Sequence, residues 1–405
     1  MNNYIINDIT QLVTCSGFSA KHGKEMSDLG IIENAAVVVT KGIITYVGPA
    51  DNNLPLDLNE NYETIDAKGK AVLPGFIDSH THFVFGGYRE EEFSQRMRGD
   101  DYLSILKSGG GIYNTVKATN EASFEELYRI AEARLDKMRT MGVTTVEGKS
   151  GYGLDKETEL KQLRVMKQLQ QKKHINIIPT YLGAHAIPKD YTEKSYIDYM
   201  LQEILPVIKE ENLAECCDIF CEKDVFSIEE SERFLSKAAE MGFKLKLHAD
   251  EIVNTGGAEL AVALNALSAD HLLQVSEKGI KALAENNTIA TLLPCTAFSL
   301  KEDYAKGRIM IDAGCAVALA TDFNPGSCFS YSIPLTIALA CIYMKLTPEE
   351  AVTALTINAA AALGKAGFIG SIDIGKKSDI IILEYPSYKF LPYHIGINCV
   401  ERTIT

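Results

Sequence analysis

The segment Val72-Leu73-Pro74-Gly75-Phe76-Ile77-Asp78-Ser79-His80-Thr81-His82 is apolar for most of its length and ends in two histidines, which predicts a buried strand with a polar end. Residues two apart on a strand project from the same face, about 6.6 Å apart. His80 and His82 can therefore bind one metal ion at bond lengths of about 2.0–2.1 Å. A His-x-His pair on its own is usually accidental, so other parts of the chain must supply the remaining ligands.

Seven further apolar segments follow, and amphipathic helices separate them. They are residues 143–147, 175–181, 217–221, 243–248, 266–270, 288–293 and 315–321. Two of the helices begin with capping boxes, Ser123-x-x-Glu126 and Ser227-x-x-Glu230. Eight buried strands that alternate with such helices predict an α/β fold, a parallel (β/α)8 barrel of the TIM type. An open, doubly wound sheet has the same alternation, and periodicity alone does not exclude it.

The two ends of the chain are β-rich instead. Residues 35–40 and 43–47 are strand-like and are joined by Lys41-Gly42, which predicts a two-residue hairpin. Residues 380–383, near the other end, are also strand-like. We therefore expect one small β-sandwich domain built from both termini. The expected domain limits are 1–66 and 365–405 for the sandwich and 67–364 for the barrel.

The composition suits a barrel with an appended domain, because the chain has 405 residues, of which 46% are hydrophobic and 23% charged. Its 40 basic and 54 acidic residues give a net charge of −14, which argues against a nucleic-acid partner or an anionic membrane surface. We expect a cytoplasmic protein, since the start resembles no secretory leader and no apolar run is long enough for a membrane span. The nine scattered cysteines fit reduced thiols.

Polar side chains collect at the predicted C-terminal ends of four strands, where a barrel keeps its active site. They are His80 and His82 after the first strand, His248 and Glu251 after the fifth, His271 after the sixth and Asp322 after the eighth. A single core histidine is usually satisfied by a backbone carbonyl, but four such strand ends together favour a site. Three imidazoles and a carboxylate suit zinc or iron and leave room for a water molecule.

This pattern resembles the amidohydrolase superfamily, in which a His-x-His on strand one, a histidine after strands five and six, and an aspartate after strand eight lie on a barrel flanked by a β-sandwich. The resemblance covers nearly the whole chain. The ligands that it implies for one divalent or trivalent metal ion, zinc or iron, are His80, His82, His248 and Asp322. Cys221-Glu222 ends strand four, where binuclear members keep a carboxylated lysine, so a single ion is favoured.

Within the superfamily, several segments are similar to the imidazolonepropionase family. They are residues 85–89, 108–112, 147–154, 183–185, 248–251 and 321–327. The similarity implies hydrolysis of 4-imidazolone-5-propanoate to N-formimidoyl-L-glutamate in histidine degradation, with a metal-activated water opening the cyclic amide. Glu251 is expected to receive the proton of that water, a role that Asp322 can share. His271 is expected to stabilise charge on the attacked oxygen.

The implied substrate carries a propanoate group, and an acidic protein needs a fixed cation near the site to bind it. Arg89 follows the first strand in the loop above the barrel mouth, and its planar guanidinium can bind a carboxylate through two hydrogen bonds. The substrate-binding residues that the family resemblance implies are Arg89, Tyr152, His185, Glu251, Asn324, Gly326 and Ser327.

Other functions and features stay open. An aminohydrolase that deaminates a purine or pyrimidine base uses the same metal, glutamate and histidine, whereas a noncatalytic barrel is expected to have lost ligands. Gly148-Lys149-Ser150 is not a phosphate loop, because Gly142 is one residue too far away. The glycine-rich segment 108–111 is either a mobile lid or loop filler. The apolar segment 331–344 is either a core helix or the contact of a homodimer.

Overall fold

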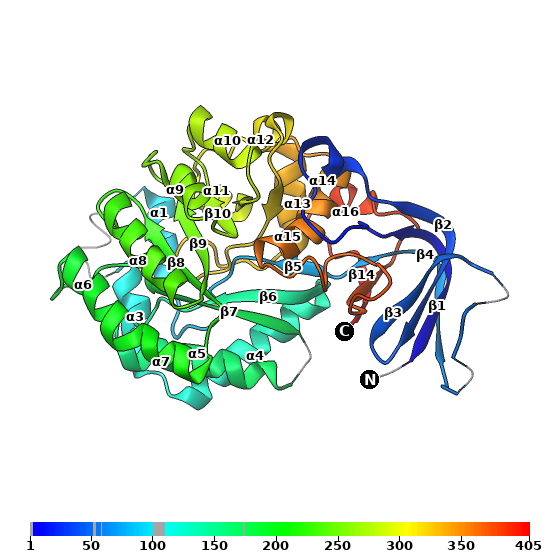
Figure 1. Ribbon diagram of the computed structural model, residues 1–405, viewed down its shortest axis with the longest axis horizontal. Coiled ribbons are helices and arrows are strands. Elements are labelled where there is room, and N and C mark those ends of the chain that lie inside the picture. The colour runs from blue at the N-terminus through cyan, green and yellow to red at the C-terminus, as the bar shows by residue number, and fades with distance from the viewer. Residues whose placement is uncertain (1–2, 52–53, 58, 100–109, 173–174) are drawn as a thin grey trace.

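The computed structural model describes residues 3–51, 54–57, 59–99, 110–172 and 175–405. Within them, eight parallel strands form one sheet and pair in the order in which they follow each other along the chain (Figure 1). These strands are β5 (Phe76–Asp78), β6 (Val143–Lys149), β7 (Asn176–Ala184), β8 (Cys216–Cys221), β9 (Lys244–Ala249), β10 (Ser268–His271), β11 (Ile289–Leu292) and β12 (Val317–Leu319). A parallel bridge between Thr81 and Phe323 joins the two edges just beyond β5 and β12. The predicted barrel is confirmed, because the sheet closes on itself.

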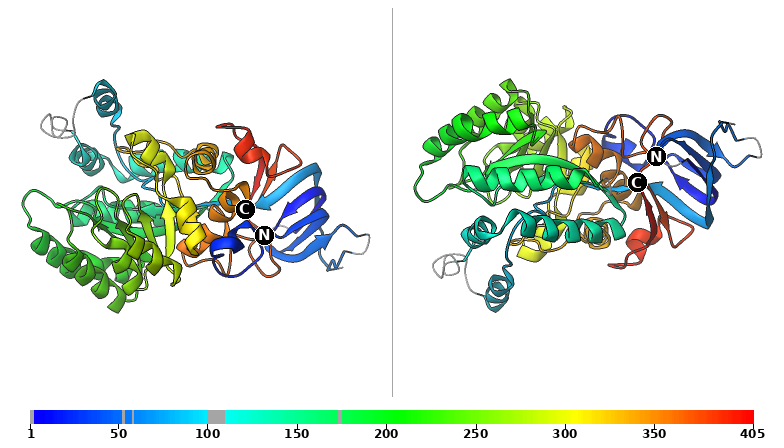
Figure 2. Two further views of the ribbon diagram at one scale, coloured as in Figure 1. Left: turned by 90° about the horizontal axis from the view of Figure 1, so that it is seen from above. Right: turned by 90° about the horizontal axis from the view of Figure 1, so that it is seen from below.

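Helices follow the strands and cover the outside of the barrel (Figures 1 and 2). The helices of the described residues are α1 (Glu90–Arg98), α3 (Ile112–Glu121), α4 (Phe124–Thr140), α5 (Lys156–Gln170), α6 (Glu193–Tyr199), α7 (Leu205–Glu211), α8 (Ile228–Glu240), α9 (Gly257–Ala263), α10 (Glu277–Ala284), α11 (Pro294–Leu300), α12 (Gly307–Ala313), α13 (Ile333–Ile342), α14 (Pro348–Ala354), α15 (Ile357–Ala362) and α16 (Phe390–Tyr393), with the 3₁₀ turn η1 (Gly23–Ser27) and the π-helical turn η2 (Met200–Ile204). Ser123 caps α4 by accepting a hydrogen bond from the backbone N–H of Glu126 at 3.1 Å, and Ser227 caps α8 in the same way. The predicted starts of these two helices are therefore confirmed.

A second sheet, of six strands in the described part of the chain, combines both termini in the order β14-β13-β4-β1-β2-β3. Its strands are β1 (Tyr4–Val13), β2 (Ile31–Thr40), β3 (Ile43–Pro49), β4 (Glu63–Pro74), β13 (Ile380–Leu383) and β14 (Val400–Ile404). Lys41 and Gly42 have φ angles of 54° and 78°, as a two-residue hairpin turn requires. Figures 1 and 2 show the two chain ends side by side next to this sheet.

The segment over residues 72–82 is divided between the two sheets. β4 continues to Pro74 and pairs there with β13, so the prediction of a single barrel strand is wrong for residues 72–74. The chain crosses into the barrel at Gly75, where a Cβ would lie 2.8 Å from Cβ of Thr144, so glycine permits the close approach. The domain limit expected after residue 66 lies inside β4, and we propose Gly75 in its place.

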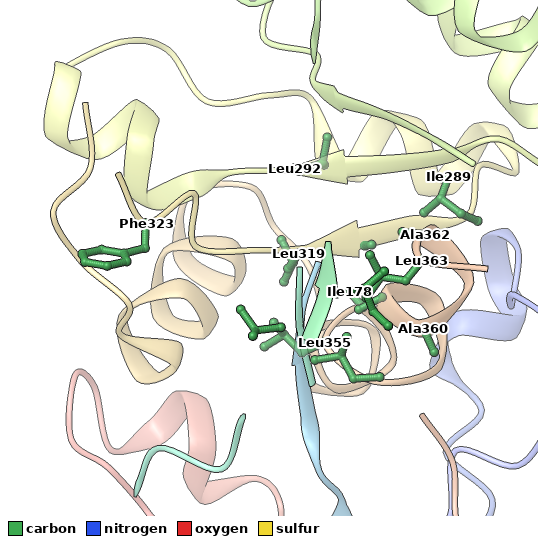
Figure 3. Close-up of a cluster of buried hydrophobic side chains, with 14 of the residues drawn as sticks. Ile178, Ile289, Leu292, Leu319, Phe323, Leu355, Ala360, Ala362 and Leu363 are labelled. Atoms are coloured by element: carbon green, nitrogen blue, oxygen red, sulfur yellow. The ribbon is translucent and has the colours of Figure 1, made fainter. Parts of the chain in front are cut away.

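Buried apolar side chains form one core in the barrel and another on the terminal sheet. Figure 3 shows Ile178 of β7 and Leu319 of β12 near the segment 355–363, which includes α15. The backbone N–H of Ile77 in β5 donates to the carbonyl oxygen of Leu355 at 2.8 Å. The barrel is therefore a packed core rather than a channel.

All nine cysteines are free, and all except Cys341 are buried, as expected for reduced thiols. The apolar segment 331–344 includes α13, which buries Ile333 and Ile337 in the barrel core. Across the described ranges, none of the helices combines the length and the apolar character that crossing a bilayer requires.

Candidate active site

The four side chains implied as metal ligands meet at the C-terminal ends of the barrel strands. His80 and His82 follow β5, and His248 lies near the end of β9. One nitrogen atom from each of these three rings lies within 4.8 Å of the others. Asp322, which follows β12, places Oδ1 3.5 Å from Nε2 of both His80 and His82. Residues that are far apart in the sequence thus converge on one point, which we call the histidine cluster.

The histidine cluster has the properties of a cation site. Nε2 of His80 and Nε2 of His248 are buried and have no hydrogen-bond partner among the described residues. Buried polar atoms are nearly always paired, so these nitrogen atoms are available to an ion. Burial holds the pKa of His80 and His82 well below its usual value, which leaves neutral imidazoles that can coordinate. Three nitrogen atoms and one carboxylate oxygen fit zinc or iron.

Asp322 is fixed by its surroundings. Its Oδ2 accepts a hydrogen bond from Oγ1 of Thr296 at 2.7 Å, while Oδ1 lies toward the histidines. Burial raises the pKa of Asp322 to about 6. The φ angles of Asp322 and His271 are 52° and 80°, in the left-handed region. Such conformations cost about 1–3 kcal/mol each and concentrate at functional sites, which agrees with their position here.

Glu251 and His271 lie beside the histidine cluster. Oε1 of Glu251 is 3.5 Å from Nδ1 of His271, and the ring centroids of His271 and His248 are 5.2 Å apart. Burial, and then the charge of Asp322, raises the pKa of Glu251 to about 8. Burial also holds the pKa of His271 well below its usual value, so that ring is neutral. A carboxyl group with a raised pKa beside a neutral imidazole can exchange protons near neutral pH.

Glu222, at the end of β8, does not join the histidine cluster. Its Oε2 accepts a hydrogen bond from the backbone N–H of Ile252 at 2.8 Å, and Oε1 accepts one from that of Lys223, also at 2.8 Å. The side chain thus fixes the loop that carries Glu251, and its charge contributes to the raised pKa of Glu251. Glu222 therefore anchors a loop and is not one of the side chains that converge in the histidine cluster.

Arg89 lies between α1 and the loop that follows β12. Its Nε and Nη2 donate to Oε2 of Glu92 at 2.9 and 2.7 Å. Its Nη1 faces Gly326, where a Cβ would lie only 2.1 Å away. Nη2 of Arg96 donates to the carbonyl oxygen of Gly326 at 2.9 Å. A glycine at 326 therefore leaves room for the guanidinium of Arg89, and two arginines meet at this loop.

Tyr152 and His185 cover one side of the histidine cluster. His185 stacks on His82 with ring centroids 5.0 Å apart and an interplanar angle of 15°, and the ring of Tyr152 lies 5.6 Å from that of His82. Burial lowers the pKa of His185 to about 3, so this ring is neutral. Gly151 has a φ of 107°, and a Cβ there would lie 2.6 Å from the carbonyl oxygen of Leu182. Glycine is therefore required beside these two rings.

Asn324 organises the loop that contains Gly326 and Ser327. Its Oδ1 accepts hydrogen bonds from the backbone N–H groups of Gly326 and Ser327, each at 2.8 Å. Its Nδ2 donates to Oγ of Ser327 and to the carbonyl oxygen of Asp322, also at 2.8 Å. Asn324 therefore connects the loop that faces Arg89 to Asp322, whose carboxylate belongs to the histidine cluster.

Known proteins resemble this chain along almost its full length. The model of the amidohydrolase family matches residues 71–404. The imidazolonepropionase of Parabacteroides distasonis is 60% identical over 402 residues, which cover 99% of this chain and 97% of that protein. The chain belongs to the amidohydrolase family. Within that family it groups with the imidazolonepropionases, since the one of Clostridium tetani is also 59% identical over 404 residues, covering 99% of this chain and 96% of that protein.

Solved structures share the fold at low sequence identity. An adenosine deaminase from Xanthomonas campestris with bound zinc has a TM-score of 0.73 at 18% identity, covering 100% of this chain and 91% of that one. A guanine deaminase from C. acetobutylicum with bound guanine has a TM-score of 0.71 at 16% identity, covering 100% and 98%. At such identities the similarity establishes a common fold and nothing about the substrate.

The barrel of this amidohydrolase also holds buried charges beneath the histidine cluster to which our sequence interpretation assigned no role. They are Glu147, Lys149, Asp218, Lys246 and Asp270. His80, Glu147 and Asp270 have the spacing of a second ion-binding group. However, the ammonium groups of Lys149 and Lys246 each lie 3.6 Å from Oδ2 of Asp270, so two cations already neutralise this group. Charged residues inside apolar strands were the available signal for this layer.

The structure describes only Gly110 and Gly111 of the glycine-rich segment 108–111, because Ser108 and Gly109 lie outside the described residues. The backbone N–H of Gly111 donates to Oε1 of Glu92 at 2.9 Å. Glu92 thus connects the start of α3 to Arg89. The lid remains a prediction.

Proposed function

We propose that this protein hydrolyses 4-imidazolone-5-propanoate to N-formimidoyl-L-glutamate, a step of histidine degradation, in the cytoplasm. The observation that carries the proposal is the identity of 60% and 59% with two imidazolonepropionases over nearly the whole chain. The arrangement of the histidine cluster and Glu251 supports it, because a cation site and a proton acceptor lie together.

In this proposal one metal ion, zinc or iron, is held by the histidine cluster. The ligands would be His80, His82, His248 and Asp322. When bound, such an ion lowers the pKa of a water molecule from 15.7 to about 7 and polarises the carbonyl group under attack. Metal analysis of protein purified without chelators tests this part. One equivalent of zinc or iron supports it, and the absence of any bound metal contradicts it.

The proposed reaction opens the ring at its amide bond. The oxygen atom of water adds to the carbonyl carbon, the carbon–nitrogen bond breaks, and the ring nitrogen takes a proton. Glu251, when ionised, takes the proton of the water and returns it to the leaving nitrogen, and its raised pKa makes this carboxylate a stronger base. Neutral His271 can donate a ring N–H to the oxygen that becomes negative, a contact worth about 10²–10³ in rate.

Arg89 would bind the propanoate group of the substrate. Glu92 fixes the plane of its guanidinium through Nε and Nη2, while Nη1 points to the loop at Gly326. Burial holds the pKa of Tyr152 above its usual value, with Arg89 opposing and Asp322 adding to that rise. Tyr152 therefore lies within electrostatic reach of both groups. His185 and Ser327 would complete the contacts with the substrate.

Incubation of the metal-loaded protein with freshly prepared 4-imidazolone-5-propanoate tests the assignment, with the ultraviolet absorbance of the substrate as the readout. Loss of this absorbance together with formation of N-formimidoyl-L-glutamate supports it. No loss of absorbance, together with ammonia release from guanine or cytosine, would favour the aminohydrolase alternative. That alternative has the support of the shared fold alone.

A homodimer is the proposed assembly. The C-terminal end of the apolar segment 331–344 leaves Ile342 and Tyr343 more than half exposed, at 54% and 57%. The ring of Tyr343 stacks on that of Tyr304 with centroids 4.8 Å apart, which adds to the apolar surface. Light scattering should give twice the mass of the chain, and an Ile342→Glu variant should give the mass of one chain. A monomeric wild-type protein contradicts this assembly.

A further inference from the structure

Five charged side chains lie inside the barrel, directly beneath the histidine cluster. They are Glu147 and Lys149 of β6, Asp218 of β8, Lys246 of β9 and Asp270 of β10, each with 0% of its surface exposed. A buried charge without a close partner costs several kcal/mol, so each of these groups depends on its neighbours. The pattern of contacts decides what this layer does.

Lys149 contacts three of the carboxylates. Its Nζ lies 2.6 Å from Oδ2 of Asp218, 3.1 Å from Oε1 of Glu147 and 3.6 Å from Oδ2 of Asp270. Lys246 is equally buried, but its Nζ lies 3.3 Å from Oε2 of Glu147 and 3.6 Å from Oδ2 of Asp270. Among the described residues, the ion pair to Asp218 involves Lys149 and not Lys246.

The carboxylate oxygens that face Lys149 also face the histidine cluster. Oδ2 of Asp270 lies 2.6 Å from Nδ1 of His80. Oδ2 of Asp218 lies 3.0 Å from Nδ1 of His248, in an oblique contact. A carboxylate oxygen can only accept a hydrogen bond, so it favours the proton on Nδ1 and leaves the lone pair on Nε2. These Nε2 atoms are two of the unpartnered nitrogens of the cluster.

We propose that Lys149 is a positioning residue for the metal centre. Its ammonium group holds Asp218 and Asp270 side by side, and each carboxylate orients a different histidine, His248 or His80, with Nε2 toward the ion. A carboxylate on the far nitrogen of a metal-bound histidine sets its tautomer and orientation, and its loss lowers metal affinity about 10–100-fold. This inference rests on the proposed metal site and extends it to a side chain that does not touch the ion.

The Lys149→Met and Lys246→Met variants form a matched pair, because each removes one fully buried ammonium group from the same layer. The dissociation constant for zinc is measured by competition with a chromophoric chelator, after circular dichroism confirms that each metal-free variant is folded. Lys149→Met should bind zinc about 10–100-fold more weakly than the wild type, and Lys246→Met should lose less, because Lys246 contacts only one of the two orienting carboxylates, Asp270. Equal losses in the two variants, or an unchanged affinity in Lys149→Met, would overturn the proposal.

Asp218→Asn gives a second test that keeps the shape of the side chain, and it decides the matter if Lys149→Met does not fold. The inference predicts a zinc affinity about 10–100-fold below that of the wild type. A folded Asp218→Asn protein with unchanged affinity overturns it. Failure of the proposed function has a different signature, because the wild type itself would then bind no zinc and leave the substrate intact.

Discussion

Oδ2 of Asp270 lies 2.6 Å from Nδ1 of His80, while Nε2 of the same ring lies 3.5 Å from Oδ1 of Asp322. The imidazole is therefore held from inside the barrel on one edge and faces the histidine cluster with the other. Asp270 lies in β10 and Asp322 follows β12, so both aspartates come from strands of the same barrel. The site is consequently built in two layers, and we propose that only the upper one faces the substrate.

Glu251→Gln tests the proton acceptor. The amide keeps the shape of the side chain but cannot take a proton from water, so kcat should fall about 10²–10⁴-fold. The content of bound metal should stay at the wild-type level, because Glu251 is not among the four proposed ligands. Activity assays with metal analysis of the same sample measure both effects. A variant that keeps more than a tenth of the wild-type kcat would rule out this role for Glu251.

The pH dependence of kcat/KM should have an acid limb. Glu251 must be ionised to act as a base, and burial with the charge of Asp322 raises its pKa from 4.5 to about 8. A bound cation shifts this pKa back toward 4.5, so the limb should fall between these values. Activity should be full above that pKa and should decline about tenfold for each pH unit below it. A rate that is constant from pH 4 to pH 9 would contradict this expectation.

Arg89→Met should weaken substrate binding. Hydrogen bonds to a charged partner contribute about 1.5–3 kcal/mol, so KM should rise about 10–100-fold, with a smaller effect on kcat. Arg98→Met is the matched control. Arg98 is exposed at the end of α1, and its substitution removes the same charge. Its KM should match that of the wild type. An equal rise in both variants would show a general charge effect instead of a specific contact.

Gly326→Ala should mimic part of the Arg89 defect without removing any charge. The new Cβ would lie 2.1 Å from Nη1 of Arg89, so the guanidinium must move. We expect KM to rise roughly tenfold, which corresponds to the loss of about one hydrogen bond to a charged group. The thermal midpoint should stay close to that of the wild type. Wild-type KM in this variant would mean that the guanidinium position does not matter for binding.

Stability should decline in alkaline solution. Burial raises the pKa of Cys15 to about 11 and that of Cys216 to about 12, from 9.0. The unfolded thiols lose their protons first, so the stabilisation is complete below about pH 9 and is lost as the pH rises toward 11. Each pH unit in that window costs up to about 1.4 kcal/mol per thiol. Urea unfolding at pH 8 and pH 10.5 measures this, and a Cys15→Ala variant should show a smaller decline. Identical midpoints at both pH values would refute it.

Much of the fold could be predicted because barrel strands are buried on both faces and are therefore nearly continuous apolar runs. The segment 315–321 is such a run, and it includes β12. Residues 72–74 were assigned to the wrong sheet for the same reason. Their apolar side chains suit either sheet, and only the pairing with β13, some 300 residues later in the chain, decides between them.

The convergence of His80, His82, His248 and Asp322 could be anticipated, since strand ends of a parallel barrel meet at one face. The layer of buried charges beneath them could not be anticipated, because sequence spacing does not tell which buried charges form ion pairs. Lys149 was considered only within the family-like segment 147–154 and as a candidate phosphate-loop residue. The same holds for two sets of hydrogen bonds that form only in the folded chain. Glu222 accepts one from the backbone N–H of Ile252, and Asn324 accepts others within its own loop. The roles of the individual residues in catalysis remain predictions.

The most direct test of the account is an anomalous-difference map from crystals of protein purified without chelators, recorded at the zinc and iron absorption edges. We predict one peak per chain, at about 2.0–2.2 Å from the side chains of His80, His82, His248 and Asp322. A map with no peak between these four side chains, or with the peak elsewhere in the barrel, would contradict the central claim that they bind a single metal ion.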